Sequence, residues 1–283
     1  MLEELERDLT PLDLNGHTQI VPVLGFPVKQ VRSPRPVSLK MQQLGFNALQ
    51  VPMLVSPESF PATVSSLKAV GNVAGFVLTV PHKVTALSHV DRVSARARTA
   101  GSINAMRREA DGSWSGDNFD GAGFVAGLKA DGHDPRGRSI MIVGLGGAGA
   151  SLAASLAEAG AAQLELYDLD NARSELVCSR LERHYPHLSI CRLDQPLSRE
   201  ADIAVNATHL GMKAADPLPF DPALLKPEAV VADAIMNPAE TALLTRAAQQ
   251  SRRVVYGENI LFYQLDLLAR FFAHADLDSD TPR

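Results

Sequence analysis

The sequence has few cysteines, few aromatic residues and no long apolar run. Its only cysteines, Cys178 and Cys191, lie near no motif of catalytic type, so we expect no disulfide framework and a reducing, cytoplasmic setting. No apolar run approaches the roughly 20 residues of a membrane-spanning helix. The acidic segment MLEELERDLT lacks the apolar core of a signal peptide. We therefore expect no membrane partner.

An excess of positive charge is also absent. The 27 Lys and Arg residues are outnumbered by 32 Asp and Glu, which gives a net charge of -5, and aromatic residues make up 5% of the chain. A nucleic-acid-binding domain usually carries a basic patch, and the one basic cluster, Arg92–Arg98, is interpreted as a face of a short helix. We expect no nucleic-acid partner, but a small-molecule substrate bound by a monomer or a homodimer.

Short β-rich segments alternate with helix-forming segments along almost the whole chain, which is the pattern of an α/β protein. The 46% hydrophobic content of 283 residues suffices for two domains. In the first half, the pattern predicts strands at Ile20–Gly25, Ala48–Pro52 and Val73–Val80, helices at 35–44 and 58–69, and a hairpin at 102–118 that turns at Asp111-Gly112. The second helix is expected to begin at Ser56 and Pro57.

From Ile140 onward the alternation predicts a doubly wound parallel sheet of the Rossmann type. Its six strand candidates are SIMIVG, QLELYD, HLSICRL, DIAVNAT, AVVADA and RRVVYG. The amphipathic run Ile260–Ala273 follows this sheet and is expected to pack back on the first domain. We predict a substrate domain at 1–121 plus 258–283 and a dinucleotide-binding domain at 122–257, with a glycine-rich junction at Gly121–Gly137.

The segment SIMIVGLGGAGASLAASLAEAG carries the clearest motif. It places G-x-G-x-x-G between a strand and an Ala-rich helix, where glycine lets the backbone approach a pyrophosphate at the helix N-terminus. A tight turn without a ligand has the same motif, but the strand-helix-strand context favours a bound dinucleotide. The residues expected to hold it are Gly144, Gly146, Gly147, Ala148 and Gly149.

The next strand, QLELYD, ends at Asp168. An acid at this point accepts hydrogen bonds from the ribose hydroxyls and repels a 2′-phosphate. Arg173, the nearest cation that could hold such a phosphate, lies further along the following helix. We therefore expect NAD as the cofactor in preference to NADP. The alternative is that Asp168 only caps that helix.

Two polar groups follow strands in the first half. The segment FVLTVPHK ends in Lys83, and desolvation at the end of a buried strand can lower the pKa of a lysine and suit it to proton transfer. His82 should point away from Lys83 by strand alternation. The segment SGDNFDG carries Asp120, which either positions Lys83 or simply stabilises a turn. A calcium loop would need later ligands that are missing, and we expect no metal.

The order of these motifs resembles the shikimate dehydrogenase family from about Val23 to Phe272. The matching segments are LTVPHK at 78–83, INA at 103–105, GDNFDG at 116–121, the glycine loop at 144–149, NATHLG at 206–211 and Gly257–Gln264. The resemblance implies a two-domain oxidoreductase that transfers a hydride between a nicotinamide cofactor and the C3 hydroxyl or ketone of shikimate or quinate.

The resemblance also implies roles for individual residues. The catalytic lysine and aspartate of the family fall on Lys83 and Asp120, which would form the proton-transfer pair. The substrate hydroxyls would be bound by Thr79, Asn104, Asp120 and Gln264. The cofactor side would be completed by Asn206, Thr208 and the backbone of Gly257.

The sequence departs from the family where the substrate carboxylate is held. The family's S-x-S-P motif reads Val31-Arg32-Ser33-Pro34, so one hydroxyl is missing. Its hydrogen bond to an anion is worth roughly 1.5–3 kcal/mol. Either Arg32 or Lys29 joins Ser33 in binding the anion, or the substrate differs. Three further departures are expected to make the same pocket bulkier or more apolar: Val77, Phe119 and Met236.

Other classes of protein stay open as alternatives. The first is a dehydrogenase of a different cyclic polyol or hydroxy acid. The second is a non-catalytic NAD-binding sensor, against which the intact Lys83 and Asp120 argue. The third is another two-domain enzyme such as a methylene-tetrahydrofolate dehydrogenase, against which GDNFDG and Gln264 argue.

Overall fold

The computed structural model describes residues 10–277, which form two compact units. The first unit comprises the described residues up to Ala97, then Gly101–Phe119, and the chain from Gln264 onward. The second comprises Arg98–Ala100 and Asp120–Tyr263. Helix α9 (Glu258–Phe272) begins in the second unit and ends in the first. The α/β two-domain class and the return of the C-terminal helix are confirmed, while the predicted limits at 121/122 and 257/258 stay a prediction.

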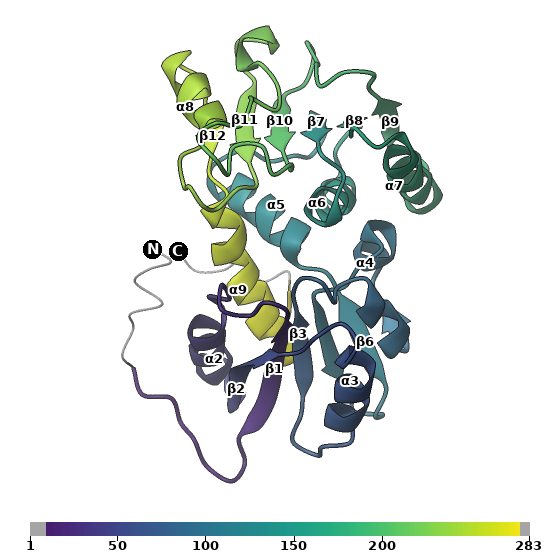
Figure 1. Cartoon of the computed structure of the whole chain (residues 1–283), viewed down its shortest axis with the longest axis vertical. Coiled ribbons are helices and arrows are strands. Elements are labelled where there is room, and N and C mark those ends of the chain that lie inside the picture. The colour runs from purple at the N-terminus through teal and green to yellow at the C-terminus, as the bar shows by residue number, and fades with distance from the viewer. Residues whose placement is uncertain (1–9, 278–283) are drawn as a thin grey trace. The chain divides into compact units, whose positions relative to one another are not determined.

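The first unit is built on a six-stranded sheet with the order β2-β1-β3-β5-β6-β4 (Figure 1). Strands β1, β2 and β3 run parallel, whereas β5 and β6 form an antiparallel hairpin beside β3. Strand β1 is buried over its last five residues because apolar side chains line both of its faces. The strands are β1 (Gln19–Gly25), β2 (Ala48–Leu54), β3 (Gly75–Leu78), β4 (Arg92–Val93), β5 (Ala105–Arg108) and β6 (Trp114–Asp117).

Two of the helical predictions for the first half need correction in detail. Helix α2 (Pro34–Gln43) lies where predicted, but α3 (Phe60–Lys68) begins at Ser59 and not at Ser56. Ser56 instead closes a turn, because its carbonyl and its hydroxyl both accept from the Ser59 N–H. The basic cluster is likewise only partly helical, since Arg92 lies in β4 and helix α4 (Ala95–Ala100) starts afterwards.

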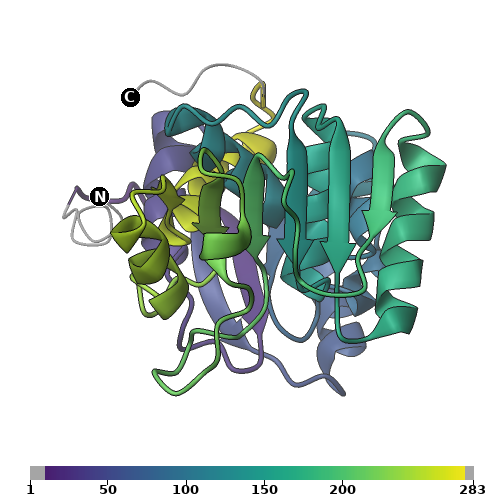
Figure 2. The ribbon, with the colours of Figure 1, turned by 90° about the horizontal axis from the view of Figure 1, so that it is seen from above.

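The second unit is a doubly wound parallel sheet, as predicted. Its strand order is β12-β11-β10-β7-β8-β9 and every neighbouring pair is parallel (Figure 1). The arrows of this sheet accordingly point the same way in Figure 2. The strands are β7 (Ser139–Val143), β8 (Gln163–Tyr167), β9 (Ser189–Arg192), β10 (Ile203–Asn206), β11 (Val230–Asp233) and β12 (Val254–Val255), and the helices that separate them include α6 (Gly147–Glu158), α7 (Asn171–His184) and α8 (Ala242–Gln249).

The glycine-rich segment 121–137, where we expected the domain junction, begins with a helix, and the change of unit falls directly before it, between Phe119 and Asp120. Helix α5 (Asp120–Ala130) takes up its first half, and Gly121, Gly123 and Gly127 are buried in it. A Cβ on Gly121 would collide with the carbonyl of Ser151 in α6. Gly121 therefore lets α5 approach α6 closely, and a Cβ on Gly127 would lie 3.2 Å from Asn259 of α9.

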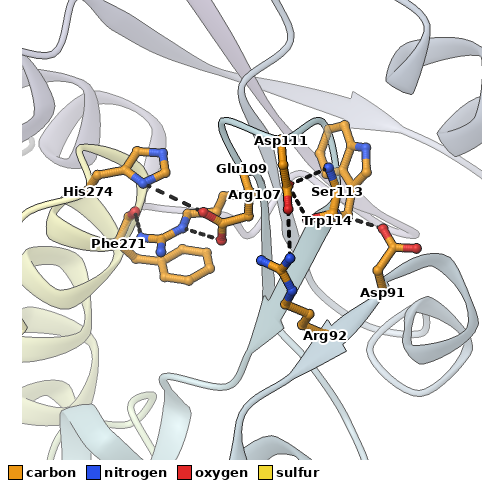
Figure 3. Close-up of polar contacts among 9 residues, drawn as sticks. All are labelled: Asp91, Arg92, Arg107, Glu109, Asp111, Ser113, Trp114, Phe271 and His274. Atoms are coloured by element: carbon orange, nitrogen blue, oxygen red, sulfur yellow. Dashed lines mark hydrogen bonds and ion pairs between the residues drawn. The ribbon is translucent and has the colours of Figure 1, made fainter.

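The C-terminal end of α9 is fixed to the first sheet by Arg107 of β5 (Figure 3). The Arg107 guanidinium donates to the carbonyl of Phe271 at 2.6 Å and lies 4.5 Å from the centre of its ring. Glu109 holds the same guanidinium at 3.0 Å. A cation that binds a terminal carbonyl also suits the negative end of the helix dipole, so Arg107 secures the helix where it ends.

The hairpin between β5 and β6 turns at Asp111-Gly112, as predicted, with Gly112 at φ 82°. Asp111 accepts hydrogen bonds from the hydroxyl and the N–H of Ser113, and it pairs with Arg92 at 2.7 Å (Figure 3). The hydrogen bonds from Ser113, and then the hydrogen bond from Arg92, lower the pKa of Asp111 to about 2. The turn is therefore held by an ionised carboxylate at neutral pH.

We predict that Gly75→Ala destabilises the protein because α9 packs against β3 at this glycine. A Cβ at position 75 would lie 2.5 Å from Cε1 of Phe272 and 2.6 Å from the carbonyl oxygen of Met106. Overpacking of this kind costs roughly 1–3 kcal/mol, measurable as a lower denaturant midpoint. Gly71→Ala is the control, since nothing lies within 4 Å of its Cβ. Equal midpoints for the two variants would contradict the packing argument.

Candidate active site

Thr79 lies at the carboxyl end of β3, next to the end of β1. Its N–H donates to the carbonyl of Leu24 at 3.0 Å. A Cβ on Gly25 would collide with the methyl group of Thr79, so the glycine that ends β1 makes room for this side chain. Thr79 is half-buried, which places the predicted substrate ligand where parallel strands end.

Lys83 lies in the turn that follows β3. The His82 N–H donates to the carbonyl of Thr79 at 2.9 Å, and the carbonyl of Lys83 accepts from the Ile103 N–H at 2.9 Å. The His82 ring is 2% exposed, stacks on Phe60 at 4.3 Å and donates from Nε2 to the carbonyl of Val55 at 2.8 Å. His82 thus anchors the turn in the core, while the half-buried Lys83 follows it.

Asn104 connects the end of β3 to the loop before Asp120. Its carbonyl accepts from Leu78 at 2.8 Å and its N–H donates to Asp117 at 2.9 Å. Its side-chain oxygen accepts from the Phe119 N–H at 2.9 Å. These bonds bring Thr79, Lys83 and Asn104, three of the predicted site residues, to one end of the first sheet.

An ion pair between half-buried Arg96 and buried Asp117, which the sequence did not reveal, stabilises the same loop. Arg96 donates from Nε and Nη2 to the two oxygens of Asp117, at 2.9 and 2.7 Å, and Ser94 donates to the same carboxylate. Asn118 donates to the hydroxyl of Ser102 at 3.0 Å. The only signal in the sequence was the arginine-containing segment before Gly101, which gives no indication of its partner.

Asp120 and Gln264 lie at the limits of the units. Asp120 is the first residue of α5, in the second unit, and Gln264 is buried on α9, where the first unit resumes. The pairing of Asp120 with Lys83 and the contact of Gln264 with substrate stay predictions.

At the divergent carboxylate motif, Ser33 is buried and donates its hydroxyl to Oε1 of Gln50 at 3.0 Å. Arg32 and Lys29 are exposed, and Val31 is half-buried. Gln50, on β2, was not singled out by the sequence, because a lone polar residue in a strand carries no motif. The structure makes it the partner of the one hydroxyl that this motif retains.

The expectation that Phe119 lines the substrate pocket is wrong, whereas the placement of Val31, Val77 and Met236 at that pocket stays a prediction. Phe119 is fully buried, with its ring 5.2 Å from that of Phe271 and 5.0 Å from the Arg96 guanidinium. It is therefore a core residue. Val77 is buried in β3 between β1 and β5, and Met236 is half-exposed in the second unit.

The glycines of the loop after β7 have two distinct roles. Gly144 has φ 93°, and a Cβ there would lie 2.7 Å from Thr208, while a Cβ on Gly149 would collide with the carbonyl of Gly144. The fold therefore requires both. A Cβ on Gly146 or Gly147, in contrast, would meet no atom within 4 Å. The open space at the N-terminus of α6 fits a pyrophosphate that approaches the backbone.

Asp168 is fixed by its neighbours at the end of β8. It accepts from the N–H groups of Leu145 at 2.7 Å and Asp170 at 2.8 Å, and Arg173 lies 3.1 Å away. Burial opposes its ionisation, but these hydrogen bonds and the charge of Arg173 hold the pKa of Asp168 below its usual value. The helix is capped by Asp170 and not by Asp168, which excludes the alternative that Asp168 is merely the cap.

Asn206 and Thr208 form a turn at the end of β10. Asn206 donates to the carbonyl of Leu210 and to Asp233, and its oxygen accepts from the N–H and the hydroxyl of Thr208. Asp233, which the sequence did not single out, is buried, and burial raises its pKa. A Cβ on Gly257 would collide with the carbonyl of Ile235. These residues shape the loops, and their contact with cofactor stays a prediction.

Within residues 10–277, no group of three His, Cys, Asp or Glu side chains is placed to hold a metal ion. Across the same residues, no helix is both long and apolar enough to cross a membrane.

We predict that Gly146→Ala and Gly149→Ala weaken different properties. Gly146→Ala should keep the wild-type melting temperature but weaken dinucleotide binding about tenfold or more, because its methyl group occupies the space of the pyrophosphate. Gly149→Ala should lower the melting temperature, because its methyl group collides with the backbone. Thermal unfolding and cofactor titration measure the two effects. Tight cofactor binding by Gly146→Ala would contradict the assignment of the loop.

Comparison with known proteins agrees with this geometry. The family model of the shikimate dehydrogenase substrate binding domain matches residues 23–106. A curated shikimate dehydrogenase (NADP(+)) of Rubrobacter xylanophilus is 37% identical, covering 89% of each chain. One of Geobacter metallireducens is 33% identical, covering 89% of this chain and 90% of its own. The solved 5-ketofructose reductase of Gluconobacter sp. strain CHM43 is 27% identical with TM-score 0.84, covering 94% and 96%.

These relatives overturn the expectation of NAD. Both curated enzymes are named for NADP(+), and the structure supplies a physical reason for the error. Arg173 lies further along the helix in sequence, yet its side chain reaches back to Asp168, so the acid does not present an uncompensated negative charge. The predicted oxidoreductase class and family are confirmed: the chain belongs to the shikimate dehydrogenase family.

Proposed function

We propose that the chain catalyses reversible hydride transfer between a nicotinamide dinucleotide and the C3 hydroxyl or ketone of shikimate, quinate or a related cyclic hydroxy acid. The observation that carries the proposal is the convergence of Thr79, Lys83 and Asn104 at the end of β3 in a member of this family. All three residues have polar side chains, and the backbone of each is held by hydrogen bonds to a neighbouring segment.

The bound nicotinamide supplies the hydride acceptor or donor. Gly146 and Gly147 leave room for its pyrophosphate at the start of α6, where unpaired N–H groups and the helix dipole favour an anion. Asp168, whose lowered pKa keeps it ionised, accepts hydrogen bonds from the ribose. The proton is then left to Lys83 and Asp120.

Lys83 moves the proton on the C3 oxygen, with Asp120 as its partner. Hydride loss from an alcohol carbon requires removal of the hydroxyl proton, and the reverse reaction requires its return. Thr79 and Asn104 orient the substrate hydroxyls. The carboxamide of Asn104 is held in one orientation, because its oxygen accepts from Phe119, and this fixes which group it turns to the substrate.

A second candidate is a dehydrogenase of a cyclic polyol or keto sugar that lacks a carboxylate. Val31 stands where the family resemblance expects a carboxylate-binding hydroxyl. The structurally similar Gluconobacter protein is a 5-ketofructose reductase. The lysine and aspartate chemistry is the same for both candidates, so the distinction rests on the carboxylate site.

We predict that Lys83→Ala lowers kcat by roughly 10²–10⁴-fold, the usual contribution of a general acid-base group. Cofactor affinity should not change, because the loop of Gly144–Gly149 belongs to the other unit. Steady-state kinetics and cofactor titration test this together. Lys129→Ala, an exposed lysine on α5, is the control. A variant with wild-type kcat would remove Lys83 from the mechanism.

The curated relatives are named for NADP(+), and we extend that cofactor to this chain. Arg173 is half-exposed beside Asp168, so it can turn to a 2′-phosphate on the ribose. Arg173→Ala should then raise KM for NADP about tenfold, the worth of one charge-assisted hydrogen bond, and leave KM for NAD within about twofold. Arg192→Ala, another half-exposed ion-paired arginine of this unit, is the control. An equal rise in KM for NADP and NAD would show that Arg173 supports the structure of the site and does not bind the 2′-phosphate.

A further inference from the structure

The carboxamide of Gln50 is buried with an unused donor. Gln50 and Ser33 are each 6% exposed, and Gln50 Oε1 accepts from the Ser33 hydroxyl at 3.0 Å. Nε2 of Gln50 is buried and has no hydrogen-bond partner in the part of the chain that the structure describes. An orphaned amide N–H is rarer and costlier in a protein interior than a carbonyl with a lone pair to spare.

The main chain around this pair is fixed. The Gln50 N–H donates to the hydroxyl of Ser38 at 2.8 Å, and that hydroxyl donates to the carbonyl of Pro34 at 2.5 Å. Gln50 also lies opposite Val21 in the parallel pairing of β2 with β1. Ser33 precedes α2 but makes no side-chain cap bond to it. The Ser33 hydroxyl is therefore committed to Gln50 and not to the helix.

The orientation of the carboxamide decides what Ser33 can bind. With Oε1 toward Ser33, the hydroxyl proton is used within the protein, and Ser33 can only accept. Rotation by 180° exchanges Oε1 and Nε2 without a change of shape. Nε2 then donates to Ser33 Oγ, and the hydroxyl proton is no longer used by Gln50 and can be donated to a ligand. This orientation gives the orphaned amide a partner and turns Ser33 into a donor, which a carboxylate needs.

We propose that Gln50 is a positioning residue that turns the Ser33 hydroxyl into a hydrogen-bond donor for the carboxylate of the substrate. The inference rests on the proposed function and deepens it, because it names the carboxylate as the group recognised. It also explains how the site works with one hydroxyl. Where Val31 removes a donor, Gln50 ensures that the remaining hydroxyl presents its proton outward.

The test is a double-mutant cycle of Gln50→Met and Ser33→Ala. Methionine keeps the length of the side chain but cannot donate or accept a strong hydrogen bond. We expect Ser33→Ala to raise KM for shikimate about tenfold and Gln50→Met roughly fivefold, with kcat changed less than about twofold, since a single hydrogen bond to an anion is removed or misdirected. The double variant should match Ser33→Ala alone, because Gln50 acts only through Ser33.

A cyclic triol that lacks the carboxylate but keeps the hydroxyls of shikimate is the matched substrate. Its KM should be the same for all three variants and the wild type. Gln43→Met, an exposed position on the last turn of α2, controls for the substitution itself, and melting temperatures confirm folding. Additive effects in the double variant, or equal losses with acid and triol, would overturn the inference and leave Gln50 as a packing residue.

Shikimate binding is also measured by calorimetry, so that the result does not depend on turnover. If the wild type binds shikimate but does not oxidise it, the proposed function fails. The shikimate affinities of the single and double variants still decide the role of Gln50. If the wild type turns over the triol better than shikimate, and Lys83→Ala abolishes that turnover, the dehydrogenase chemistry holds and the carboxylate inference is wrong.

Discussion

The hydrogen bonds between the end of β3 and the segment 103–104 are the constraint on which the first unit's site depends. Lys83 lies on no helix or strand, so its backbone has no regular element to hold it. Its carbonyl is instead bonded to Ile103, and the residue before Thr79 is bonded to Asn104. The antiparallel pairing of β5 with β3 thereby extends to Leu78 and Asn104, and a separate bond from Ile103, outside this register, holds the loop at Lys83.

In the second unit, the shape of the loop after β7 depends on the backbone conformation of its glycines. The fold requires glycine at positions 144 and 149, where a Cβ would collide with neighbouring atoms. A Cβ on Gly146 or Gly147 would meet no atom within 4 Å. Asp168 is drawn into the same loop because it accepts from Leu145. The glycine loop after β7 and Asp168 at the end of β8 are therefore joined by a direct hydrogen bond. Arg173 forms an ion pair with Asp168 in this structure.

Much of this could be predicted from sequence, and the failures have physical causes. Period-2 and period-3.6 patterns, with glycine at turns, were enough for both sheets except β4, and for the loop at Gly144. The close packing of α5 on α6 at Gly121 could not be predicted, because a glycine in a loop and a glycine at a helix contact look the same in a sequence. Arg173 was misjudged because sequence separation does not measure the reach of a long side chain across a helical turn. Phe119 and Gln50 needed three-dimensional neighbours, which no local pattern contains.

Helix α9 makes the first unit discontinuous in the chain. Phe272 is 1% exposed and packs at Gly75, but almost the whole second unit is encoded between them. This face of the sheet is therefore covered by a contact between residues that lie far apart in the chain. Contacts of this kind slow folding, because the entropy cost of closing the intervening chain must be overcome before the contact forms. The covering of this face is thus expected to be a slow step in the folding of the first unit.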